Sequence, residues 1–294
     1  MISTTAPPIL APIERSPGYW STVWRRFLRD PVAVGAGLVV LALILMAIFA
    51  NWVAPQDPYQ GMALRRLRPP GSDGYPLGTD ELGRDMLSRL IFGARISLFM
   101  GVTPVLLALF MGTTIGIVAG YVGGWTNTIL MRTIDVFFAF PSVLLAIAIS
   151  GAMGAGIVNG LIALTLVFIP PIARVAESVT TGVRSRDYVE AARASGASAF
   201  TIIRRHVLGN VLGPIFVYAM SLIAVSMILA SGLSFLGLGV KPPEPDWGLM
   251  LNTLRTAIYT QPLLCALPGV MIFITSISFN LLTDGLRSAM DIKS

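Results

Sequence analysis

Long stretches without a charged residue, of which three are considered first, constrain this chain more than any other feature of its sequence. Residues 32–54, 96–131 and 136–173 contain no Asp, Glu, Lys or Arg. A helix that crosses the hydrocarbon core of a bilayer needs about 20 apolar residues, and each stretch is at least that long. In water such segments would have no place to bury their surface, whereas a lipid environment requires them. The sequence therefore predicts an all-α integral membrane protein.

The composition supports this prediction. Hydrophobic residues make up 54% of the chain and charged residues 12%, whereas soluble domains have about 25% charged residues. The net charge of +6 accompanies the apolar segments. We therefore interpret it as attraction to anionic membrane lipid, with no nucleic-acid partner.

The apolar segments divide into six predicted transmembrane helices. The first covers residues 32–54, and the stretch 96–131 is one helix followed by a turn at Gly123, Gly124 and Trp125. The stretch 136–173 is too long for one helix, and the glycines at 151, 154 and 156 divide it into two. Two further helices are predicted near residues 211–236 and 263–282. Six crossings place both termini on the same side of the membrane.

This reading divides the chain into consecutive segments. The first apolar segment is too long for the apolar core of a signal peptide and lacks a clear small-residue cleavage site, so we expect it to remain as an anchor. The predicted segments are an N-terminal segment at 1–30, the first transmembrane helix at 31–55, an extracytoplasmic loop at 56–92, a five-helix core at 93–287 with a long inner loop at 176–208, and a tail at 288–294.

The orientation follows from the basic residues, which are enriched in cytoplasmic loops. With the N-terminus inside, 13 of the 21 Lys and Arg residues lie on the inner side, and residues 174–206 alone carry six arginines. This loop is therefore predicted on the cytoplasmic side, and with it both termini.

Residues suited to catalysis or metal binding are scarce. Cys265 is the only cysteine and His206 the only histidine, which excludes an internal disulfide and any metal site rich in His or Cys. Asp80, Glu81 and Asp85 lack the alternating oxygen ligands of a calcium loop, so we expect a capped surface helix there and no metal. No Walker-type phosphate-binding motif occurs. The sequence predicts no cofactor and no enzymatic activity of its own.

Arg132 and Asp135 are three residues apart, a spacing at which they can pair on one helix face. We place them near one membrane surface. The spans then contain no ionisable pair near mid-membrane, which argues against a stand-alone secondary carrier.

Gly112, Gly116 and Gly120 repeat every four residues within a predicted span. This spacing puts three small residues on one helix face, where a neighbouring backbone can approach closely. Tight helix packing is the expected role, and a pore-lining role is the alternative.

The inner loop contains a predicted helix–turn–helix unit. Asp187 is a suitable N-cap, and Glu190, three residues later, can complete a capping box. Gly196 suits the left-handed position that ends a helix. Ser198 can cap a second short helix through residues 202–208. A rigid unit held at both ends by spanning helices suits the transmission of force from a cytosolic partner.

Within this unit, Glu190-Ala191-Ala192, then Gly196, then Val207-Leu208 and Asn210 resemble the EAA loop of ABC importer permeases. In that family the loop forms a coupling helix that docks on the ATP-hydrolysing subunit. By this resemblance the contact residues would be Tyr188, Glu190, Ala191, Ala192, Ala194 and Gly196. The family usually has proline just before the position of Asn210, whereas this chain has Gly209, so a different turn is expected there.

Two other stretches resemble the permeases of dipeptide, oligopeptide and nickel importers. They are Leu77-Gly78-Thr79-Asp80-Glu81-Leu82-Gly83-Arg84-Asp85 with its continuation to Leu98, and Leu233-Ser234-Phe235-Leu236-Gly237-Leu238-Gly239-Val240-Lys241-Pro242-Pro243, which continues to Gly248. The resemblance extends from about Trp24 to Arg287. It implies the type I ABC importer permease fold, with six transmembrane helices and a cytoplasmic coupling helix.

The resemblance also implies a set of partners in a bacterial-type inner membrane. These are a second homologous permease subunit, two cytosolic ATPase subunits and an extracytoplasmic solute-binding protein. Di- or oligopeptides are the expected solutes, and nickel, glutathione or another small solute are alternatives. Three other classes are alternatives. A stand-alone secondary carrier would need a buried titratable site, and an intramembrane enzyme would need a catalytic constellation at membrane depth, and the predicted spans offer neither. A scaffold subunit is the third, and the coupling loop argues against it.

Overall fold

The computed structural model describes residues 19–290. The predicted N-terminal segment and tail lie partly outside this range. Within it the chain is helical, and its β-type pairing is limited to isolated bridges. The helices are α1 (Tyr19–Phe27), α2 (Pro31–Ile48), α3 (Ala50–Val53), α4 (Met86–Val122), α5 (Gly124–Phe138), α6 (Ser142–Met153), α7 (Ile157–Arg184), α8 (Asp187–Ala194), α9 (Ala199–Ile202), α10 (Leu208–Phe235), α11 (Trp247–Leu254) and α12 (Pro262–Met290).

Among the described residues, five helices or continuous helical segments are long and apolar enough to cross a membrane, and a bent pair counts as a sixth. The bent pair is α5 and α6, whose axes differ by 87°. The prediction of an all-α membrane fold is confirmed. The stretch 136–173 divides between Met153 and Ile157, as expected, but it contains a second break that was not predicted. Pro141 precedes α6 there and disfavours a helical conformation in the residue before it.

The second span begins earlier than its uncharged stretch. Asp85 is the N-cap of α4, and its carboxylate accepts hydrogen bonds from the Ser88 backbone nitrogen at 2.8 Å and from Ser88 Oγ at 2.6 Å. The first residues of α4, including Arg89, therefore lie in the segment that we assigned to the extracytoplasmic loop. Such a cap satisfies orphan backbone donors, which helps a helix to begin in a polar region.

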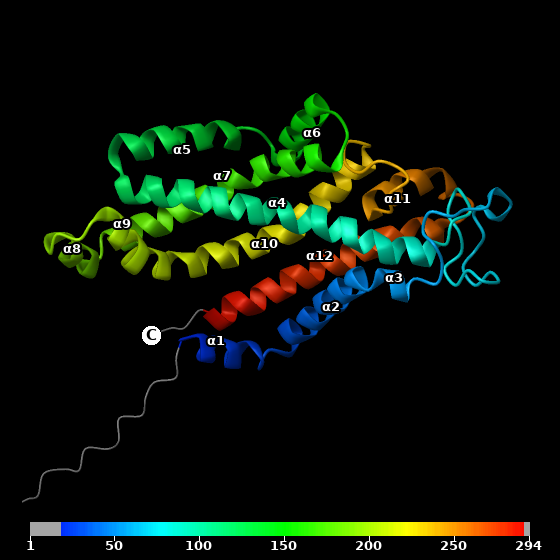
Figure 1. Ribbon diagram of the computed structural model, residues 1–294, viewed down its shortest axis with the longest axis horizontal. Coiled ribbons are helices and arrows are strands. Elements are labelled where there is room, and N and C mark those ends of the chain that lie inside the picture. The colour runs from blue at the N-terminus through cyan, green and yellow to red at the C-terminus, as the bar shows by residue number, and fades with distance from the viewer. Residues whose placement is uncertain (1–18, 291–294) are drawn as a thin grey trace, which may run out of the picture.

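The helices form a long bundle whose two ends differ (Figure 1). α5 and α6 cover one side of the α4 and α7 pair, and α12 and α2 lie on the opposite side. One end carries α8, α9, α1 and the end of α12, and the other end carries α11 and the chain between α3 and α4. The two terminal helices and the inner loop thus share one end of the bundle.

Close contact between α4 and α7 depends on small residues. A Cβ atom at Gly116 would lie 2.5 Å from the Ala173 carbonyl oxygen and 2.5 Å from Ala176 Cβ. A Cβ atom at Gly112 would lie 2.9 Å from the Ile169 carbonyl oxygen, and one at Gly120 would lie 2.7 Å from the Glu177 carbonyl oxygen. These distances are too short for any side chain, so the three glycines allow the two backbones to touch.

Candidate functional site

The inner loop forms a short helix with a defined end. α8 stops at Ala194, and Gly196 follows with φ of 79°. The Ala197 backbone nitrogen donates to the Ala192 carbonyl oxygen at 3.1 Å, and the Gly196 nitrogen donates to that of Arg193 at 3.0 Å. This pair of bonds is a Schellman motif, which favours glycine at the left-handed position.

The predicted capping box is absent. Arg186 is the N-cap residue of α8, without a side-chain cap, and Asp187 is already in the first helical turn together with Glu190. Two carboxylates in that turn still interact favourably with the positive end of the helix dipole. The start of α8 therefore relies on charge, and the box prediction was one residue out of register.

One residue anchors α8 and the rest of it faces solvent. Val189 is fully buried, whereas Tyr188, Glu190, Ala191 and Ala194 are exposed and Ala192 is half-buried. Gly196 is also exposed. The residues selected from the EAA resemblance therefore lie together on a projecting element (Figure 1).

Phe200 is a candidate contact residue that the sequence analysis missed. Its side chain is 73% exposed on α9, close behind the α8 turn. Aromatic residues are enriched at protein–protein interfaces, and Phe200 lies beside the residues selected on α8. The signal available from sequence was a single aromatic residue between Ser198 and two arginines.

The loop is tied to the next span by side chains. Asn210 Nδ2 donates to Tyr188 Oη at 3.2 Å and to the His206 carbonyl oxygen at 2.7 Å. The Tyr188 ring lies 6.2 Å from the His206 ring, centroid to centroid. A displacement of α8 would therefore act directly on the start of α10.

The second short helix does not end as predicted. Ser198 caps it, accepting from the Thr201 nitrogen at 3.3 Å, as expected. The chain then continues through a π-helical turn at Ile203–Val207 directly into α10. Gly209 lies in that continuous helix, with no atom close to where its Cβ would be. The different turn expected at Gly209 is therefore not a turn: the chain is helical through this position.

The opposite end of the bundle is closed by the other two resembling stretches. Arg84 Nε donates to Asp80 Oδ2 at 2.6 Å, and Arg89 Nε lies 3.1 Å from the same oxygen. Arg89 Nη1 donates to the Pro58 carbonyl oxygen at 3.1 Å. Asp80 and Asp85 are buried, so the prediction of a capped surface helix was right about the cap and wrong about the surface.

Asp246 joins the two stretches. Its carboxylate accepts from Ser97 Oγ at 2.7 Å and from the Leu249 nitrogen at 3.0 Å. The neighbouring Trp247 is fully buried, and its Nε1 donates to the Leu90 carbonyl oxygen at 3.0 Å. Complete burial raises the pKa of Asp246 above the ordinary aspartate value, against these hydrogen bonds. Residues about 150 positions apart thus pack together at this end of the bundle.

Polar contacts also link α5 to α7. Asp135 accepts from Arg174 Nη2 in an ion pair whose side chains are about half exposed, so the predicted pairing with Arg132 is wrong. Asn127 Nδ2 donates to Glu177 Oε1 at 2.7 Å. Helix packing decides these partners, because it brings together residues 39 and 50 positions apart.

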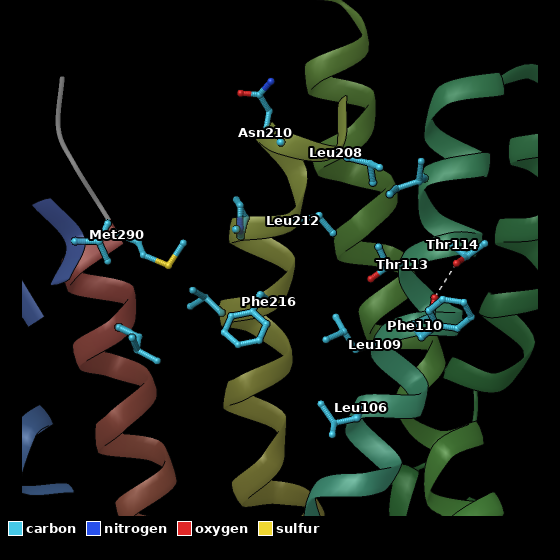
Figure 2. A pocket seen from close by; sticks show the side chains of 17 residues that line it. Leu106, Leu109, Phe110, Thr113, Thr114, Leu208, Asn210, Leu212, Phe216 and Met290 are labelled. Atoms are coloured by element: carbon cyan, nitrogen blue, oxygen red, sulfur yellow. Dashed lines mark hydrogen bonds between the residues drawn. The ribbon is translucent and has the colours of Figure 1, made fainter. Parts of the chain in front are cut away.

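A large cavity lies between α1, α4, α10 and α12. Its volume is about 1240 Å³. Figure 2 shows Leu106, Phe110 and Phe216 toward one end and Asn210 at the other. Its polar side chains are Thr113, Thr114 and Asn210, and no charged residue of the described chain lines it. A space of this kind fits an apolar ligand better than a charged solute.

In the described range, no group of three or more His, Cys, Asp or Glu side chains is placed to hold a metal ion. Cys265 is half-buried, and its Sγ contacts the Leu254 carbonyl oxygen at 3.1 Å. His206 lies in the π-helical turn.

Comparisons with known families match both parts of the chain. Residues 112–293 match the family model described as binding-protein-dependent transport system inner membrane component. Residues 18–70 match the model of the N-terminal transmembrane domain of oligopeptide transport permease C.

Similar proteins carry transport names. The chain is 44% identical, over 98% of its length and 95% of the relative's, to the glutathione transport system permease protein GsiD of Pectobacterium atrosepticum. It is 43% identical, over the same shares, to the protein of that name in Escherichia coli.

Solved structures share the fold at low sequence identity. An inward-facing MetNI methionine ABC transporter chain has a TM-score of 0.57 and 16% identity, covering 69% of this chain and 97% of that one. An amino acid ABC transporter chain has a TM-score of 0.51 and 16% identity, covering 67% and 91%.

Proposed function

Because this chain belongs to the family of binding-protein-dependent transport system inner membrane components, we propose that it forms half of the translocation channel of an importer for small peptides. It is a multi-pass permease of the inner membrane and a transport protein of the ABC importer class. Peptides are the proposed solutes. The oligopeptide permease match supports this choice, and glutathione, itself a small peptide, appears in the names of the relatives.

The proposed partners are a second homologous permease subunit, two cytosolic ATPase subunits and an extracytoplasmic solute-binding protein. ATP hydrolysis then takes place on the partners. The solute-binding protein would dock at the end that carries α11, and the ATPase at the end that carries α8. Both termini, residues 1–30 and 288–294, are proposed to be cytoplasmic, and the five-helix core expected at 93–287 is proposed to include the start of α4 at Met86.

The observation that carries this proposal is the projecting, firmly anchored α8. We propose that Tyr188, Glu190, Ala191, Ala192, Ala194 and Gly196 contact the ATPase, together with Phe200. Val189 is buried behind them, and the Asn210–Tyr188 hydrogen bond links the contact to α10. Movement of the ATPase would bias α10 between two states of the channel, which is the physical content of allosteric coupling.

Cysteine crosslinking tests this contact. On a background in which Cys265 is replaced by serine, single substitutions Ala192→Cys and Ala194→Cys are treated with a short thiol crosslinker in native membranes. We expect crosslinks to an ATPase subunit whose yield changes with ATP. Ser288→Cys, exposed at the same end of the bundle but on α12, is the matched control and should crosslink far less.

The opposite result would remove the mechanism. If both α8 cysteines react with a soluble thiol reagent but capture no ATPase, energy does not enter through α8. A secondary-carrier mechanism would then have to be considered.

A further inference from the structure

The cavity between α1, α4, α10 and α12 is lined by Asn210, which links α8 to α10, and otherwise mostly by apolar side chains. Its volume of about 1240 Å³ exceeds the roughly 300–1,000 Å³ of pockets for drug-sized ligands. Phe110 is 77% exposed and Phe216 46% exposed in the described chain. Apolar side chains at a gap between spanning helices must be covered by another apolar surface.

Basic residues stand beside the lining residues on three of the four elements. On α12, Arg287 lies one helical turn before the lining residue Met290. On α1, Arg26 lies one helical turn after the lining residue Val23, and before α10, Arg205 lies one turn ahead of Leu208. Residues three or four positions apart share a helix face. All three arginines are exposed.

Acidic groups are fewer here. Asp30 caps α2, and its carboxylate accepts hydrogen bonds from the Val32 and Ala33 backbone nitrogens. Asp284 is exposed on α12. Arg205 and Arg287 take part in none of the ion pairs within residues 19–290. Beside the lining residues, three arginines therefore face two aspartates, and the local charge is positive.

We propose that this cavity binds one anionic phospholipid, with an acyl chain between α4 and α10 and its phosphate near Arg205, Arg287 and Arg26. Basic pockets between transmembrane helices recognise acidic headgroups in this way. Phosphate favours arginine because the planar guanidinium forms two parallel hydrogen bonds. The apolar lining supplies a second requirement that a free phosphate ion would not meet.

Retention of lipid by the purified protein tests the headgroup contact. The tagged full chain, with whatever subunits it carries, is isolated from membranes containing phosphatidylglycerol and phosphatidylethanolamine and analysed by native mass spectrometry. We expect one retained phosphatidylglycerol. Each arginine near an anionic group contributes roughly fivefold to affinity, so Arg205→Gln with Arg287→Gln should weaken binding about 25-fold. Arg255→Gln, exposed at the other end of the bundle, should retain the lipid.

A second variant tests the apolar part without changing charge. A Cβ at Gly213 would meet only Met290 Cε, at 3.1 Å, and both residues line the cavity. Gly213→Leu should therefore fill the space, and it raises helix propensity at that position. We expect loss of phosphatidylglycerol from this variant while all three arginines remain.

Two outcomes would overturn the proposal. One is equal retention of phosphatidylglycerol and phosphatidylethanolamine, or equal retention by the arginine variants. The other is a photo-crosslinker at Leu212 that captures a second protein chain in place of lipid, because the cavity would then be a subunit interface. Neither readout needs ATP or transported solute, so failure here is distinguishable from failure of the proposed importer function.

Discussion

At the scale of single residues, side-chain volume on α4 is the most sharply constrained quantity. Gly116 is enclosed by the Ala173 carbonyl oxygen and Ala176 Cβ, both 2.5 Å from where its Cβ would be. The obstacle is backbone and a short side chain, neither of which can move aside locally. Relief would require α4 and α7 to separate along their length.

We therefore expect Gly116→Ala to lower the stability of the protein by about 1–3 kcal/mol, the usual cost of overpacking a filled interface. The measurement is the thermal unfolding midpoint of the purified protein in detergent. Gly182→Ala on α7, where no atom lies within 4 Å of the added Cβ, is the control and should be neutral or slightly stabilising. Equal midpoints for the two variants would contradict the close contact.

At the scale of elements, the α8 unit derives its shape from one backbone position. Gly196 has φ of 79°, which ends α8 and redirects the chain to Ser198. A side chain in this left-handed conformation costs about 1–2 kcal/mol. The cost falls on the turn between α8 and α9, outside the packed bundle.

Gly196→Ala should therefore leave the overall thermal midpoint nearly unchanged but weaken the proposed coupling to the ATPase. We expect lower ATP-driven uptake at equal protein abundance, measured in membrane vesicles. Gly209→Ala is the matched control, because Gly209 lies in helix with open space around it. Unaltered uptake by the Gly196 variant would show that the turn geometry does not matter for coupling.

Also at this scale, the third crossing shows how a break changes an element. α5 and α6 form a pair bent by 87°. Apolar length predicted a crossing there, and the break at Pro141 determined its path. Asp135, three residues before the end of α5, then pairs with Arg174 of α7.

At the scale of the whole molecule, the two ends of the bundle carry different structural elements. The end with α11 is closed by buried ion pairs and by Asp246 and Trp247. The end with α8 carries the exposed loop unit and the described parts nearest both termini (Figure 1).

Opposite ends should react from opposite sides of the membrane. On the Cys265→Ser background, Leu64→Cys, at a side chain that is 91% exposed, should react with an impermeant thiol reagent added to intact cells. Ser195→Cys, exposed after α8, should react only after the membrane is opened. Labelling of Ser195→Cys in intact cells would reverse the proposed orientation.

Much of the fold could be predicted from the sequence, because its main determinant is local. Runs of apolar residues long enough for a bilayer predicted the membrane fold, and Gly196 and Ser198 marked turn and cap by their own backbone preferences. The EAA spacing similarly identified α8 before its position was known.

Tertiary structure alone decided which side chains meet. Asp135 pairs with Arg174 and not with Arg132, and Asp80 is buried beneath Arg84 and Arg89. The cavity is lined by residues of four helices that are far apart in the sequence. The physical reason is that span length and turns depend on neighbouring residues, whereas ion-pair partners, burial of charge and empty space depend on how distant helices pack.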